Sequence, residues 1–150
     1  RDGVRLVSAV LGSGWGDVGK QKKWTDTKAL MDYGFAVFHP YEAVQAGESF
    51  GEIRITDSPT TQMETILAEG YTALFSDAEI EKLHLTADLP KELAAPVHRG
   101  ERLGQAVLWL GEERLAAVDL LAAEDAMPYT LAQRLLRLAE GWLSWRNWKD

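Results

Sequence analysis

The chain of 150 residues carries 16 basic and 23 acidic side chains, a net charge of −7, and no cysteine. This length suits one domain with a buried core plus short appendages. The acidic balance argues against nucleic acid as a partner, because phosphate binding draws on clustered Lys and Arg. The absence of cysteine excludes thiol nucleophiles, thiolate metal sites and disulfides.

The N-terminal part of the chain is predicted to form a strand, a loop and a helix. Residues 4–11 are an unbroken run of aliphatic and β-branched side chains bounded by glycines, which favours a strand buried on both faces. A glycine-rich loop follows, and Thr25 or Asp26 can cap a helix that runs to about Phe38. The short basic run before that helix is interpreted as a solvated loop: Lys20, Lys22 and Lys23.

Residues 41–127 are predicted to form a small, mostly antiparallel β-sandwich or barrel, because they consist of short apolar runs broken by Gly, Pro, Asp and Ser. Ile53 and Ile55 alternate with polar residues, as in half-buried strands, and Gly111–Glu113 is a hairpin-turn signal. Residues 80–93 are ambiguous, since their Leu and Lys content also suits a helix. The predicted fold class is therefore α+β, mainly β.

The tail, residues 128–150, is predicted to form one amphipathic helix with a broad apolar stripe. It carries four basic and two acidic side chains, whereas the rest of the chain carries 12 basic and 21 acidic ones. A cationic helix with Trp on its apolar side suits the headgroup region of an anionic membrane. The candidate membrane-binding residues are Leu131, Arg134, Leu135, Arg137, Leu138, Trp142, Leu143, Trp145, Arg146 and Lys149.

Two features limit that interpretation of the tail. The helix would lie on a membrane and not cross it, because Arg134, Arg137 and Glu140 interrupt the run of about 20 apolar residues that spanning requires. Broad apolar faces are also commonly buried, so the stripe suits docking on the protein's own core or on a partner helix. The tail sequence leaves the membrane and the docking interpretations open.

No catalytic, cofactor or metal site is predicted within the chain. Gly14–Gly19 matches GxGxxG, but Lys20–Lys23 separates it from the predicted helix and no second parallel strand follows, so it is interpreted as a connecting loop. The histidines lack the spacing of metal ligands: His39, His84 and His98. The serines lie in neither GxSxG nor SxxK: Ser8, Ser13, Ser49, Ser58, Ser76 and Ser144.

Two segments nevertheless carry a family resemblance. The first consists of Arg5–Val7, Val10–Gly12 and Thr27–Phe35. It resembles the closing strand and last helix of the penicillin-recognising domain in D-alanyl-D-alanine carboxypeptidases, which are serine peptidases. The second segment resembles the β-rich C-terminal domain of the same enzymes, and it consists of Ala95–Val97, Gly100–Glu101, Gly104–Gln105 and Val118–Ala122. The likeness runs along the entire chain in the family's order.

The resemblance implies three parts. Residues 1–40 would be the last strand and helix of the catalytic domain, 41–127 the β-rich domain, and 128–150 a membrane-anchoring helix. The intact enzyme would remove the terminal D-alanine of peptidoglycan stem pentapeptides outside the bacterial cytoplasmic membrane. The family's SxxK, SxN and KTG motifs lie upstream of the matched strand and are absent here, so the chain alone is predicted to be inactive.

The implied partners are the upstream catalytic domain, peptidoglycan and the membrane surface, with no nucleic acid, no cofactor and no metal. Self-association through the terminal helix stays open. The alternative function is that of a non-catalytic β-domain that binds a partner protein through this helix. The presence of SxxK, SxN and KTG in the preceding sequence would decide for the enzyme.

Overall fold

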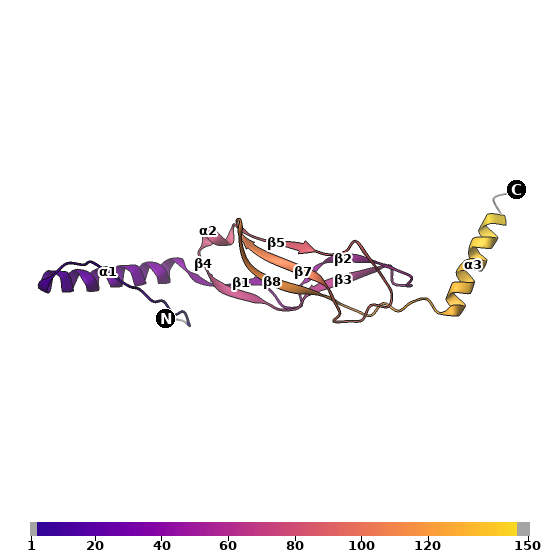
Figure 1. The fold of residues 1–150 in the computed structure, drawn as a ribbon, viewed down its shortest axis with the longest axis horizontal. Coiled ribbons are helices and arrows are strands. Elements are labelled where there is room, and N and C mark those ends of the chain that lie inside the picture. Colours follow the sequence, from indigo (N-terminus) through magenta and orange to yellow (C-terminus); the bar gives the residue numbers. More distant parts are fainter. Residues whose placement is uncertain (1–2, 147–150) are drawn as a thin grey trace.

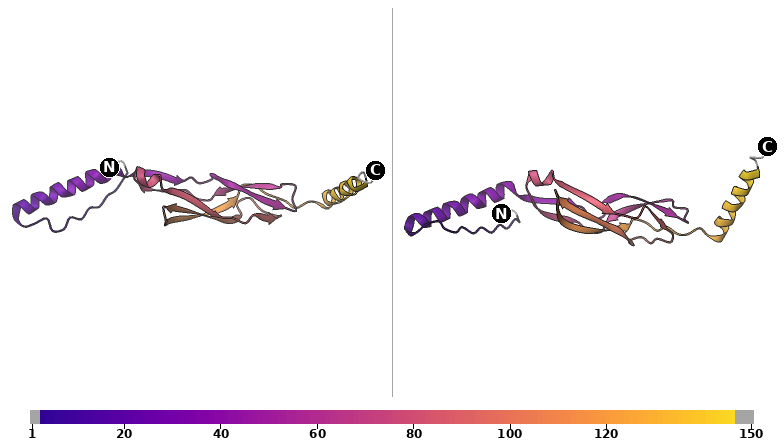
Figure 2. Two further views of the ribbon diagram at one scale, coloured as in Figure 1. Left: turned by 90° about the horizontal axis from the view of Figure 1, so that it is seen from above. Right: turned by 45° about the horizontal axis from the view of Figure 1, so that its top comes forward.

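The computed structural model describes residues 3–146 of the chain. The molecule is elongated, with helix α1 (Gly16–Val37) at one end, a body of β-strands in the middle and helix α3 (Leu131–Arg146) at the other end (Figure 1). Two further views show the same three-part arrangement (Figure 2). The two long helices are therefore separated by the length of the β body.

The β body contains a six-stranded sheet in the order β5-β7-β8-β3-β2-β6 and a two-stranded sheet of β1 and β4. All strand pairs are antiparallel except β2 with β6. A short helix, α2 (Asp77–Ile80), lies between β4 and β5. The prediction of a mainly β fold is thus confirmed. The strands are β1 His39–Val44, β2 Ser49–Thr56, β3 Gln62–Leu67, β4 Tyr71–Phe75, β5 Leu83–Asp88, β6 Glu92–Ala94, β7 Arg102–Leu110 and β8 Glu113–Ala122.

The core of the body follows the alternation seen in the sequence. Ile53 and Ile55 point inward and are 2% and 3% exposed, and they form one apolar cluster with Met63 and Val97. A second cluster contains Leu108 and Leu120, among others. Burial of alternate side chains on each strand is what holds these sheets together, because each strand then presents one apolar face to the interior.

Strand pairing shows the outcome for the ambiguous segment 80–93 and for the predicted hairpin turn. Residues 80–93 do not continue a helix, because α2 ends at Ile80 and Leu83–Asp88 pairs antiparallel with β7. The predicted hairpin is confirmed, since Leu110 pairs with Glu113 across the turn. Gly111 has a φ of 59° in that turn, a conformation that favours glycine.

The predicted strand over residues 4–11 is wrong: no strand is assigned there in the described chain. The segment runs extended along α1 (Figures 1 and 2), and the Leu6 side chain lies where a Cβ on Gly34 would be. It is not buried on both faces, because Val7 and Leu11 are 98% and 92% exposed. An apolar run becomes a buried strand only where neighbouring strands supply backbone partners and cover its faces.

The start of the first helix was also predicted wrongly, since α1 begins at Gly16 and not at Thr25. Gly14 and Gly16 have positive φ values, which let the chain reverse direction at this point. Gly19 packs directly on the Gly14 backbone, where a Cβ would clash. The lysines predicted to lie in a solvated loop, Lys20, Lys22 and Lys23, are therefore exposed residues of the helix.

This correction removes one of the two reasons for rejecting a dinucleotide-binding loop. Gly14–Gly19 opens directly onto α1, so no basic segment separates the two. The other reason stands, because β1, the first strand after the helix, pairs antiparallel with β4. A dinucleotide-binding unit requires two parallel strands joined by the helix.

Candidate functional site

Helix α3 begins at a capping box formed by Thr130 and Gln133. The Thr130 backbone N–H donates to Gln133 Oε1 at 2.9 Å, and the Gln133 N–H donates to Thr130 Oγ1 at 3.3 Å. These reciprocal bonds satisfy N–H groups that the first turn would otherwise leave without partners. A helix is present over Leu131–Arg146, within the predicted range, while Lys149 lies outside the described residues.

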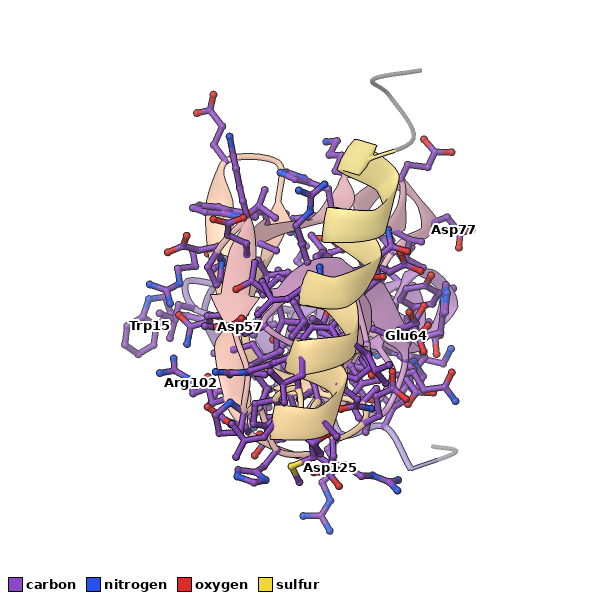
Figure 3. The ribbon with its side chains drawn as sticks, turned by 90° about the vertical axis from the view of Figure 1, so that its right-hand side faces the viewer. Trp15, Asp57, Glu64, Asp77, Arg102 and Asp125 are labelled. Atoms are coloured by element: carbon purple, nitrogen blue, oxygen red, sulfur yellow. The ribbon has the colours of Figure 1, made fainter. Side chains whose placement is uncertain are left out.

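The leucine stripe of α3 is uncovered. Leu131, Leu135 and Leu138 are 81%, 65% and 70% exposed, and the neighbouring Leu136 is also exposed. Figure 3 views the molecule along its length from the α3 end, with the helix in front of the body. The structure places Trp142, Leu143, Trp145 and Arg146 on the same helix, although their side chains lie outside the described ones. Large exposed apolar patches mark interaction surfaces.

The described part of the chain contains no helix that is long and apolar enough to cross a bilayer. This matches the charge pattern of α3, in which Arg134 and Arg137 interrupt the leucines. The exposed leucines give the helix an apolar face, and the two arginines place positive charge next to it. That combination is typical of helices that lie in a membrane interface.

Two residues that the sequence did not single out join α3 to the body. The Tyr129 backbone N–H donates to the Asp57 carbonyl oxygen at 3.0 Å, which ties the start of the helix to the turn between β2 and β3. The Arg137 guanidinium carbon lies 4.5 Å from the centre of the Tyr129 ring, within cation–π range. A hollow of about 410 Å³ is lined by Asp57, Tyr129, Arg134, Arg137 and Leu138. Of Asp57 and Tyr129, only Asp57 lies in a stretch that the sequence marks locally, as part of a turn.

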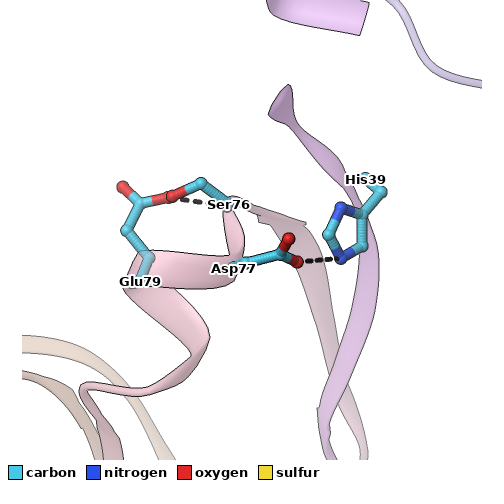
Figure 4. A network of polar contacts seen from close by, with 4 residues as sticks. All are labelled: His39, Ser76, Asp77 and Glu79. Atoms are coloured by element: carbon cyan, nitrogen blue, oxygen red, sulfur yellow. Dashed lines mark hydrogen bonds and ion pairs between the residues drawn. The ribbon is translucent and has the colours of Figure 1, made fainter. Parts of the chain in front are cut away.

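Ser76 and His39 make polar contacts at the start of α2. The Ser76 backbone N–H and hydroxyl both donate to Glu79 Oε2, at 2.8 and 2.7 Å, at the start of α2 (Figure 4). Both bonds lower the pKa of Glu79 from its ordinary value of 4.5, and the bond from the backbone N–H has the larger effect. Next to them, His39 Nε2 lies 3.5 Å from Asp77 Oδ1 (Figure 4).

Neither a metal site nor a nucleophile is assembled from the candidate residues that the structure describes. Among the side chains that the structure describes, no three His, Asp or Glu come together as a metal site. His98 pairs only with Asp125, at 3.8 Å, and His84 Nδ1 approaches the Lys82 carbonyl oxygen at 3.3 Å. Ser58 is buried and accepts a bond from the Thr60 N–H. Helix α3 with its hollow is therefore the candidate site.

Comparison with known proteins gives a consistent family. The family model described as "Penicillin-binding protein 5, C-terminal domain" matches residues 38–127, which is more than half of the chain. D-alanyl-D-alanine carboxypeptidase DacA of Haemophilus influenzae is 26% identical over 126 residues. That match covers 81% of this chain and 30% of DacA, so the chain spans about a third of its relative's length.

Two solved structures share the fold. Penicillin binding protein 5 from Haemophilus influenzae has a TM-score of 0.55 at 20% identity, covering 71% of this chain and 31% of that one. D-alanyl-D-alanine carboxypeptidase DacD from Francisella tularensis has a TM-score of 0.53 at 16% identity, covering 76% and 29%. In both cases the likeness covers less than a third of the larger protein.

Proposed function

Because the chain belongs to the family of penicillin-binding protein 5 C-terminal domains, we propose that it is the C-terminal portion of a bacterial D-alanyl-D-alanine carboxypeptidase. In this proposal the β body is a spacer and α3 anchors it to the outer face of the cytoplasmic membrane. The observation that carries the proposal is the uncovered leucine stripe of α3, which lies at the far end of the body from α1.

The shape of the molecule supports the spacer role. The segments that resemble the catalytic domain, the 4–13 stretch and α1, lie at one end and α3 lies at the other (Figure 1). Helix α3 runs steeply across the long axis of the body in that view. When such a helix lies flat in a membrane interface, the body projects away from the surface. The catalytic cleft would then be held at a set height above the membrane.

The chemistry itself is proposed for the intact enzyme. A serine acyl-enzyme requires a hydroxyl activated by a nearby base and an oxyanion hole, and the SxxK, SxN and KTG motifs that supply them in the family do not occur in this chain. The 150-residue chain should therefore form no covalent adduct with a fluorescent penicillin on a denaturing gel. Stoichiometric labelling of the chain would contradict the assignment of catalysis to an upstream domain.

The anchor role is tested by co-sedimentation with phosphatidylglycerol vesicles. Leu135→Glu and Leu138→Glu each place one negative charge in the exposed stripe and should abolish binding, because the stripe must enter the interface. Gln133→Glu is the matched control, since it adds the same charge on the polar face and keeps a capping-box residue at that position. It should retain most of the binding.

Absence of vesicle binding by the unaltered chain would remove the anchor proposal. The alternative function would then be better supported: a β-domain that binds a partner helix or a second copy of the chain through α3. Sedimentation velocity separates these two partners, because self-association through the leucine stripe makes the sedimentation coefficient depend on protein concentration. The same Leu135→Glu variant would abolish that dependence.

A further inference from the structure

The hollow beside α3 has the composition of an anion-binding site. It is lined by two arginines, one tyrosine, one aspartate and one leucine, and it lies where the helix meets the turn between β2 and β3. We propose that this hollow, formed by Asp57, Tyr129, Arg134, Arg137 and Leu138, binds the phosphodiester of an anionic lipid headgroup. The inference deepens the membrane-anchoring function proposed above and depends on it.

The two arginines are available for a ligand. Among the described residues, none of the ion pairs engages Arg134 or Arg137. Together with the Asp57 carboxylate they give the lining a formal charge of +1, which one phosphodiester neutralises. Guanidinium groups bind phosphate oxygens through two parallel N–H bonds, which an ammonium group cannot do.

The Arg137 side chain stacks on an aromatic ring in the absence of a ligand. Its guanidinium lies 4.5 Å from the centre of the Tyr129 ring, and Tyr129 is itself held by the bond from its N–H to the Asp57 carbonyl. Stacking on an aromatic ring leaves the edges of a guanidinium free to donate hydrogen bonds. This stacking restricts the Arg137 side chain, which lowers the entropy cost of ordering it around a ligand.

The neighbouring leucines identify the phosphate as that of a lipid. Leu138 lines the hollow and is 70% exposed, and it belongs to the same stripe as Leu131 and Leu135. Arg134 lies one helical turn before Leu138, so the two side chains are neighbours on the helix surface. A phosphate held by the arginines would thus stand at headgroup depth, with its acyl chains beside the leucines.

Charge-preserving substitutions test this site against a diffuse attraction between the helix and the membrane. The whole chain is titrated with phosphatidylglycerol vesicles at fixed salt, as wild type, as Arg134→Lys with Arg137→Lys, and as the control Arg114→Lys. The control makes the same exchange at an exposed position of β8, in the body and outside the proposed membrane-binding surface. The double variant should bind about fivefold more weakly, because Lys lacks the planar fork, while the control stays within about twofold of wild type.

Each outcome has a distinct meaning. Equal binding by wild type and both variants would overturn the hollow as a site and leave the membrane anchor in place. No binding by the wild type would overturn the anchor and the inference together. A third arm follows the Arg134 and Arg137 side-chain NMR signals with inorganic phosphate alone. If phosphate shifts them and the variants bind vesicles like wild type, the hollow is a site for free phosphate, and the lipid assignment is wrong.

Discussion

Apolar side chains are buried in the β body and exposed at the two ends of the molecule. In the body, Leu108 and Leu120 are 1% and 0% exposed, whereas Leu131 in α3 is 81% exposed and Val7 beside α1 is 98% exposed. Burial of apolar surface is the main force that stabilises a fold. The body therefore contains its own stabilisation, while the ends carry surfaces that suit other molecules.

The two ends also differ from each other. In α3 the exposed leucines recur along one stripe, as a membrane interface requires. The exposed aromatics of the other end, including Trp15, Trp24 and Tyr33, do not form one stripe on α1, and part of that helix is covered by the extended 4–13 segment. In the function proposed above, the first surface contacts the membrane and the second contacts the upstream catalytic domain.

The largest expected difference between body and ends is in local stability. In a monomeric sample, amide hydrogens of residues 103–121 should exchange only on global unfolding, at an opening free energy of about 5 kcal/mol or more. Those of residues 4–11 should exchange much faster, because this segment lies against α1 on one side only. Native-state hydrogen exchange measures both, and equal protection of the two segments would break the comparison.

Truncation of a leucine should lower the free energy of unfolding in the body and leave it nearly unchanged in α3. Leu108→Ala should lower the free energy of unfolding by about 3 kcal/mol, because it leaves a cavity among well-packed neighbours. Leu135→Ala removes the same atoms from an exposed site and should change it by less than about 0.5 kcal/mol. Urea unfolding gives both values. A similar loss for both variants would show that α3 is packed on the body.

A smaller effect is expected where two strands of the body approach closely. A Cβ at Gly104 would clash with the Asp88 backbone and lie 2.8 Å from Leu89 Cδ2. Gly104→Ala should therefore lower the free energy of unfolding by about 2 kcal/mol through overpacking, as urea unfolding would measure. An unchanged unfolding midpoint would mean that β5 and β7 can separate at this position without cost.

The smallest effect concerns pH and the cap of α2. Hydrogen bonds from Ser76 lower the pKa of Glu79 from 4.5, so the folded state binds that proton less readily than the unfolded state does. The carboxylate therefore stabilises the fold above the unfolded pKa, and this contribution is lost as the pH falls through the lowered folded pKa. NMR titration of the Glu79 carboxyl group should show the lowered midpoint. Ser76→Ala removes the hydroxyl donor and should raise the midpoint part of the way, because the backbone N–H still donates to Glu79. An unchanged midpoint in that variant would remove the hydroxyl from the explanation.

The sequence predicted the body and α3 because both depend on short-range patterns. Alternation marks Ile53 and Ile55 as inward-facing, and the helical spacing of Leu131, Leu135 and Leu138 indicates α3. The predicted strand over 4–11 was wrong because its partners would have to come from other strands, and the start of α1 was wrong because the glycine turn and the Gly14–Gly19 contact act in three dimensions. The hollow could not be predicted, since Tyr129 and Asp57 lie far apart in sequence and meet only in the fold.

The central claim is that α3, and no other exposed surface of the chain, contacts the membrane. Hydrogen exchange of the whole chain with and without phosphatidylglycerol vesicles tests it most directly, because a helix buried in an interface loses access to water. We predict added protection within residues 131–146 and none within residues 4–37 or 103–121. Protection confined to residues 4–37, or no change anywhere, would contradict the claim.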